Sequence, residues 1–148
     1  MVADAQLFDA ESVAAMAQRV ILRAAITGNC VIVGRGAECV LRGHPGVLRV
    51  FIYSGWAERL ARARQRLGAN SDPGGFLRSA DRTRAAYVRR YFGRDWKDPQ
   101  LYHLMISSQV GIEEAASMIL RAVKGSEFAA AADPTTRLSE GKAVSVPA

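Results

Sequence analysis

The sequence predicts an α/β domain built on a parallel sheet, and three observations support this fold class. Three short apolar runs rich in β-branched or aromatic residues, at 30–33, 47–53 and 101–106, are predicted strands. Segments with helical periodicity lie before, between and after these runs. The run at 30–33 is apolar at every position, which is typical of a parallel strand buried on both faces. We therefore expect three parallel strands in one sheet with helices packed on it.

Residues 10–27 are predicted to form the first helix. Apolar residues recur at i, i+3, i+4, i+7, i+8 and i+11, and we expect this face to be buried: Val13, Met16, Ala17, Val20, Ile21, Ala24. Asp9 is a candidate N-cap, and Gly28 closes the helix before the first strand.

The first predicted strand ends in Gly34-Arg35-Gly36. Ligands of open α/β sheets bind outside the carboxyl ends of the strands, so Arg35 is the first candidate for contact with an anion. A guanidinium presents a planar fork of donors that suits phosphate oxygens. In the alternative interpretation, the two glycines only form the strand exit and Arg35 pairs with a nearby acid. A helical turn at 37–42 and a turn at 43–46 then lead to the second strand.

The middle of the chain is strongly cationic. Between residues 59 and 97 there are eleven Lys or Arg and three acids. This stretch holds two predicted helices, 56–67 and 76–92, separated by a glycine-rich loop at 68–75. Arg59, Arg62 and Arg66 share one helix face, which is either a solvated basic face or a phosphate-facing edge. Phosphates, on a nucleotide or a polynucleotide, are the natural partners of such a surface.

The last predicted elements are a strand at 101–106 and a helix at 112–124. We expect the helix to bury one apolar face: Ile112, Ala115, Ala116, Ile119, Val123. From Gly125 onwards the periodicity is lost. We therefore divide the chain into an α/β domain, 1–125, and a disordered C-terminal tail, 126–148.

Composition excludes several classes of protein. A chain of 148 residues suits one domain, and it has no apolar run long enough for a membrane span. We expect no secretory signal at the N-terminus and a cytoplasmic location. Cys30 and Cys39 are predicted to be reduced, buried and structural. His44 and His103 have no metal-ligand partner at helical or hairpin spacing.

Several segments together resemble the cytidylate kinase-like family of P-loop nucleoside monophosphate kinases. In the first half these are Asn29-Cys-Val-Ile-Val-Gly-Arg-Gly-Ala, Val47-Leu-Arg-Val-Phe-Ile-Tyr and Glu58-Arg-Leu. The more specific half is similar to the arginine-rich lid of that family: Asp81-Arg-Thr-Arg-Ala-Ala-Tyr, Tyr91-Phe-Gly-Arg-Asp-Trp and Asp98-Pro-Gln-Leu-Tyr. The resemblance covers roughly residues 10 to 124.

The resemblance implies a fold, a reaction and a set of site residues. The fold would be the three-layer parallel sheet of P-loop nucleoside monophosphate kinases. The reaction would be transfer of the ATP γ-phosphate to CMP or a related nucleotide, with ATP and Mg²⁺ as cofactors. By motif position, Arg84 and Asp81 match the catalytic lid best. The residues implied in nucleotide or phosphate binding are Gly34, Arg35, Gly36, Arg82, Tyr87. The family usually has Gly-Arg-Asp at the strand exit; Gly36 stands in place of that acid.

The sequence departs from the family at its start. Phosphoryl transfer in this class uses a glycine-rich loop and a lysine at the phosphates, and no G-x-x-x-x-G-K-[ST] occurs among the 148 residues. We therefore expect a fold incomplete at the N-terminus, a chain inactive as it stands, and a sheet edge that a second copy or a partner covers. The alternatives are a non-catalytic nucleotide-binding relic and a basic nucleic-acid-binding module.

Overall fold

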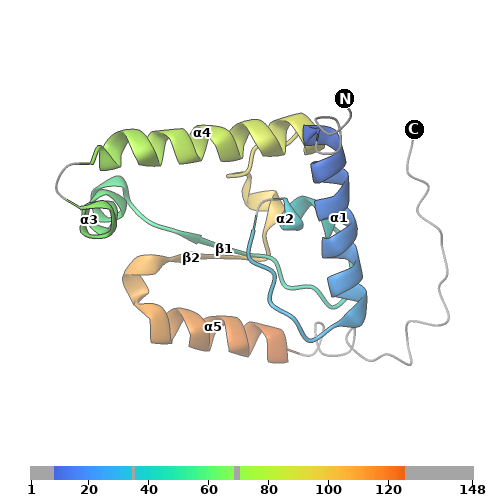
Figure 1. Cartoon of the computed structure of the whole chain (residues 1–148). Helices are drawn as coiled ribbons and strands as arrows, with labels where there is room; N and C mark the ends of the chain where they lie inside the picture. The colour runs from blue at the N-terminus through green and yellow to red at the C-terminus, as the bar shows by residue number, and fades with distance from the viewer. Residues whose placement is uncertain (1–8, 35, 69–70, 126–148) are drawn as a thin grey trace, which may run out of the picture.

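The computed structural model describes residues 9–34, 36–68 and 71–125. Five helices and two strands occur in these ranges (Figure 1). In chain order they are α1 (Ala10–Thr27), α2 (Ala37–Val40), β1 (Val50–Tyr53), α3 (Trp56–Leu67), α4 (Pro73–Phe92), β2 (Leu104–Ser107) and α5 (Ile112–Lys124). Two short 3₁₀ turns, Pro99–Leu101 and Ser108–Val110, flank β2. The predicted tail at 126–148 lies outside the described residues.

Strands β1 and β2 form a two-stranded parallel sheet. Val50 pairs with Leu104 and Tyr53 with Ser107, so both strands end at the same edge. The long connection between them carries α3 and α4, as parallel pairing requires. Figure 1 shows the sheet between α4 on one side and α5 on the other. The α/β class and the parallel pairing of the second and third predicted strands are therefore confirmed.

The predicted strand at 30–33 is wrong for this structure. These residues form no ladder, and Val31 and Val33 are 91% and 92% exposed. An apolar, β-branched run favours a strand only where a neighbouring backbone accepts its hydrogen bonds. The sheet of the described chain has two members, and the segment belongs to neither. Cys30 is consequently exposed rather than buried; both cysteines are free thiols.

The helix boundaries follow their caps. Asp9 Oδ1 accepts a hydrogen bond from Ser12 N at 2.6 Å and begins α1 where the sequence predicts it. Helix α4 begins at Pro73, three residues before the predicted start. The reason is that Asp72 Oδ1 caps the first turn through Gly75 N at 2.9 Å, and proline is pre-organised for the first helical position. Helices α3 and α5 have their predicted bounds.

The predicted buried faces of the outer helices are largely exposed. On α1, Ala14 and Ala25 are buried, whereas Val13 and Val20 are 50% and 61% exposed. On α5, Ala115 is buried and Ile112 is 86% exposed. Helical periodicity identifies an apolar face, but a face is buried only where another element lies against it. Much of the apolar surface of α1 and α5 is therefore uncovered within the described chain.

Some of the best-buried side chains come from α4, the 3₁₀ turn before β2 and β2 itself. Val88, Leu101 and Ile106 have at most 3% of their surface exposed. Tyr102 Oη donates to the Trp96 carbonyl at 2.6 Å, and the Tyr102 ring stacks on Phe51 of β1 with centroids 4.9 Å apart. This packing fixes the loop after α4 against the sheet and so positions the site described below. Within the described ranges, no helix is both long and apolar enough to cross a membrane.

Candidate functional site

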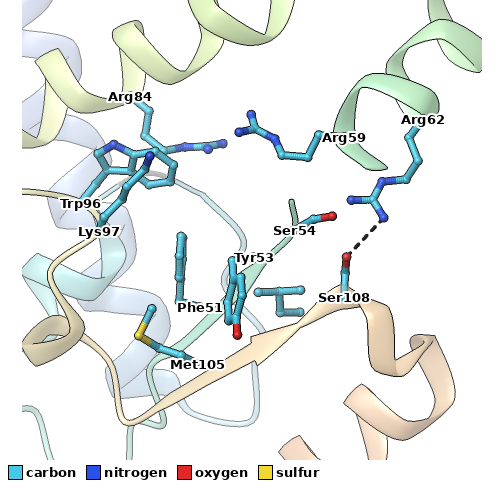
Figure 2. A pocket seen from close by; sticks show the side chains of 11 residues that line it. Phe51, Tyr53, Ser54, Arg59, Arg62, Arg84, Trp96, Lys97, Met105 and Ser108 are labelled. Atoms are coloured by element: carbon cyan, nitrogen blue, oxygen red, sulfur yellow. Dashed lines mark hydrogen bonds between the residues drawn. The ribbon is translucent and has the colours of Figure 1, made fainter. Parts of the chain in front are cut away.

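A pocket of about 470 Å³ opens at the carboxyl ends of β1 and β2 (Figure 2). Its floor comes from the two strands, and its walls come from α3, α4 and the loop after α4. The lining residues are Phe51, Ile52, Tyr53, Ser54, Arg59, Arg62, Arg84, Trp96, Lys97, Met105 and Ser108. The volume is within the range of small-molecule sites. The pocket lies where the rule for open α/β sheets places a ligand.

The walls of the pocket are cationic. Arg59, Arg62, Arg84 and Lys97 line it, and no Asp or Glu is among the lining residues. Arg62 Nη1 donates to Ser108 Oγ at 3.3 Å, which joins α3 to the end of β2 (Figure 2). Four positive side chains around a partly apolar cavity favour an anionic ligand.

Arg59 is held by an acid beside the pocket. Its Nη1 and Nη2 donate to Asp81 Oδ2 and Oδ1 at 2.8 and 2.7 Å, a bidentate pair that joins α3 to α4. Hydrogen bonding from the Arg59 guanidinium holds the pKa of Asp81 below its usual value, and the same contact raises the pKa of Arg59. Arg84 Nη1 lies 3.9 Å from Asp81 Oδ1. Asp81 is therefore ionised at neutral pH and acts on two pocket cations.

Trp96 lies beside Arg84 and Lys97. The Arg84 Cζ lies 4.8 Å from the centre of the Trp96 ring, and the Lys97 Nζ lies 5.1 Å from it. Both distances allow a cation–π interaction. Trp96 also meets Phe51 edge to face, with centroids 5.6 Å apart. An indole that is only 7% exposed thus sets the positions of Arg84 and Lys97.

The strand exits are cross-linked by polar contacts. Ser54 Oγ, just after β1, donates to Glu58 Oε2 at 2.6 Å. Gln109, just after β2, donates to the other oxygen of Glu58. Hydrogen bonding from Ser54 and then from Gln109 lowers the pKa of Glu58. The hydroxyls of Ser54 and Ser108 therefore have defined positions at the pocket edge.

The structure separates the residues predicted from the sequence into three groups. Arg84 lines the pocket, and Asp81 lies beside it. Gly36 and Tyr87 lie together in a packing contact, because a Cβ at Gly36 would be 3.2 Å from the Tyr87 ring. Gly34 and Arg82 are exposed and do not line the pocket. Arg35 lies outside the described residues, so its predicted contact with an anion stays a prediction.

Sequence reasoning did not select four pocket residues that the structure brings together: Arg59, Arg62, Trp96, Lys97. The signal for the two arginines was the basic face of the helix at 56–67, for which a phosphate-facing edge was one of two interpretations. The pocket geometry favours that interpretation for Arg59 and Arg62. Arg66 of the same helix is exposed and does not line the pocket.

The described residues do not fit a protein-bound Mg²⁺. Among them, no group of three or more His, Cys, Asp or Glu side chains could hold a metal ion. Mg²⁺ prefers carboxylate and other oxygen ligands, and the carboxylates of Asp81 and Glu58, which contact pocket-lining residues, already accept hydrogen bonds from Arg59 and from Ser54 and Gln109. The described side chains alone therefore form no Mg²⁺ site.

Comparisons with known proteins agree with the sequence motifs. A family model described as the cytidylate kinase-like family matches residues 2–110. A similar solved structure is that of an uncharacterized protein from Eubacterium ventriosum. It has a TM-score of 0.67 and 23% sequence identity, and the match covers 79% of this chain and 68% of that one. This likeness shows a shared fold. No curated protein matches the chain.

Proposed function

The chain belongs to the cytidylate kinase-like family, and on that premise we propose that it binds a nucleoside monophosphate of the cytidylate type. The binding site is the pocket at the carboxyl ends of β1 and β2. One observation carries the proposal: four cationic side chains and no acid line a cavity whose floor is apolar and aromatic. A nucleoside monophosphate has a negatively charged phosphate, which suits the cationic walls, and a planar base, which suits the apolar floor.

Each part of the pocket has a role in this proposal. Arg62, Arg84 and Lys97 attract and bind the phosphate. The side chains of Tyr53 and Met105, which are 46% and 39% exposed, offer an apolar surface to the base. Ser54 and Ser108 present hydroxyls, which bind polar groups of the sugar or the base.

We further propose that the 148-residue chain alone does not transfer a phosphoryl group. The family implies ATP and Mg²⁺, but the sequence holds no G-x-x-x-x-G-K-[ST] and the described residues do not fit a Mg²⁺ site. Transfer depends on holding the phosphates in line and neutralising charge on the γ-group. The pocket cations supply charge on one side only. We also infer the three-layer architecture of P-loop nucleoside monophosphate kinases, which the position of the sheet between α4 and α5 supports (Figure 1).

Polynucleotide binding receives less support from the same contacts. Most of the aromatic side chains that alternate with the basic residues are used in packing, although Trp56 is 44% exposed. Trp96 is buried, and Tyr87 contacts Tyr91 and Phe92 with ring centroids 4.9 and 6.1 Å apart. Stacking of bases requires open ring faces.

Isothermal titration of CMP into the full 148-residue chain tests the proposal. Replacing Arg62→Ala should weaken binding about three- to tenfold, because one charge-assisted contact is lost at an exposed position. The matched control is Arg66→Ala on the same helix, which should leave binding unchanged. Absence of CMP binding, or equal losses in both variants, would contradict the proposed site.

Two further measurements separate the alternatives. With CMP and MgATP, ADP release should stay at background; turnover in the range of about 1–100 per second would refute the inactive state. Binding of a single-stranded oligonucleotide that is stronger than that of CMP and falls steeply with salt would favour the nucleic-acid alternative.

A further inference from the structure

The ion pair between Arg59 and Asp81 occupies donors that a phosphate would use. Arg59 gives both terminal nitrogens of its guanidinium to the two oxygens of Asp81. The planar fork of arginine suits carboxylate and phosphate alike. While the pair holds, the end-on fork formed by the two terminal nitrogens is therefore occupied, although Arg59 lines the pocket.

Asp81 also acts on the neighbouring pocket cations. Arg84 Nη1 lies 3.9 Å from its carboxylate, and the charge of Lys97 contributes to lowering its pKa. The Asp81 carboxylate thus interacts electrostatically with three of the four cations that line the pocket. The side chains of Arg59 and Asp81 are 24% and 23% exposed, so an incoming anion can reach the pair.

We propose that Asp81 is an internal competitor for the phosphate of the ligand. Its carboxylate takes the position of an anion at Arg59, and the phosphomonoester exchanges with it on binding. The exchange opens the ion pair that joins α3 to α4, so binding is coupled to the release of α4 from α3. This inference rests on the proposed function, because it concerns the same pocket and the same class of ligand.

The alternative is that Asp81 only positions Arg59 for the ligand, and the two roles predict opposite effects of neutralising it. Loss of a positioning group frees one arginine side chain and weakens binding by the cost of ordering it again. Loss of a competitor opens the guanidinium fork and removes a negative charge beside the phosphate, and both changes strengthen binding. The bidentate contact takes one N–H from each terminal nitrogen and places a negative charge beside any phosphate at Arg59, so we expect the second pair of effects to be the larger.

Isothermal titration of CMP into the full-length wild type and Asp81→Asn tests the inference. Asparagine keeps the shape of the side chain and removes its charge; Asp81→Ser is a second neutral variant if the first does not fold. We expect CMP to bind Asp81→Asn about fivefold more tightly than the wild type. The control Glu114→Gln makes the same charge change on α5, at a residue that does not line the pocket, and should leave the affinity unchanged. Circular dichroism and thermal melting confirm that each variant is folded at the titration temperature.

The outcomes separate this inference from the proposed function. Tighter binding by the neutral Asp81 variants alone supports internal competition. Equal or weaker binding by those variants overturns it, while CMP binding by the wild type and a loss on Arg62→Ala leave the proposed function intact. An equal gain in Glu114→Gln would show a net-charge effect and overturn the specific role of Asp81. Failure of the wild type and the neutral variants alike to bind CMP would refute the proposed function and this inference with it.

Discussion

Substituting Gly36 by alanine should destabilise the fold through two separate strains. Gly36 precedes α2 with φ of +86°, in the left-handed region, where an L-residue costs about 1–2 kcal/mol. A Cβ there would lie 2.7 Å from Phe92 Cε2 and 3.2 Å from Tyr87 Cε1. Such overpacking typically costs about 1–3 kcal/mol. Alanine also lowers the conformational entropy of the unfolded chain relative to glycine, which stabilises the folded state by about 0.4–1 kcal/mol and offsets part of this loss.

The net expectation for Gly36→Ala is a loss of about 2–4 kcal/mol in the free energy of unfolding. For a chain of this size the melting temperature should fall by roughly 10 °C. Urea denaturation at 25 °C, followed by circular dichroism and by tryptophan fluorescence, measures the free energy directly.

Gly34→Ala is the matched control, since both glycines belong to the predicted nucleotide-binding segment. A Cβ at Gly34 meets no atom within 4 Å, and its φ is not in the left-handed region. We expect Gly34→Ala to change the free energy of unfolding by less than about 0.5 kcal/mol. A Gly36→Ala protein as stable as the wild type, or equal losses in the two variants, would refute the reasoning.

Three further predictions use other contacts. Burial raises the pKa of Cys39 to about 11, whereas Cys30 is exposed, so iodoacetamide at pH 8 should alkylate Cys30 first, as peptide mass spectrometry will show. Arg59 lowers the pKa of Asp81, so the stabilisation from this pair is present above about pH 4 and is lost as the pH falls through the lowered pKa. In Asp81→Asn the urea concentration at the unfolding midpoint should therefore vary less with pH in that acid range. Tyr102→Phe removes the donor to the Trp96 carbonyl and should cost about 1 kcal/mol in urea denaturation, whereas Tyr53→Phe, on an exposed ring, should cost less.

The helices could be predicted from the sequence because their signals are local. Asp9 and Gly28 bound α1, and periodicity and glycine placement bound α3 and α5 at the observed residues. The start of α4 required the recognition that Asp72 and Pro73 form a cap rather than a loop. Such signals act within one turn of helix, so no tertiary information is needed to detect them.

Burial and pairing could not be predicted in the same way. The run at 30–33 has the composition of a central strand, yet Val31 and Val33 are almost fully exposed. The apolar face of α1 has the correct period, yet Val20 is 61% exposed. Composition specifies which structure a segment favours when another element packs or pairs with it. The presence of that element depends on the tertiary fold. These residues are exposed within the described chain. The expectation that a second copy or a partner covers a sheet edge therefore stays a prediction.

The candidate site shows the same division between local and tertiary information. The sequence places a cationic surface between residues 59 and 97, and part of that surface lines the pocket, whereas Gly34 and Gly36 of the predicted ligand segment do not line it. A cation is available to a ligand only where no acidic side chain pairs with it, and the pairing acid can lie far away in the sequence. Arg59 and Asp81 are 22 positions apart on two helices, and their bidentate contact joins a positive and a negative side chain into one neutral pair. Arg62, three positions from Arg59, donates to the Ser108 hydroxyl and lines the pocket. The electrostatic character of the pocket therefore follows from the angle at which α3 meets α4, which no local pattern in the sequence encodes.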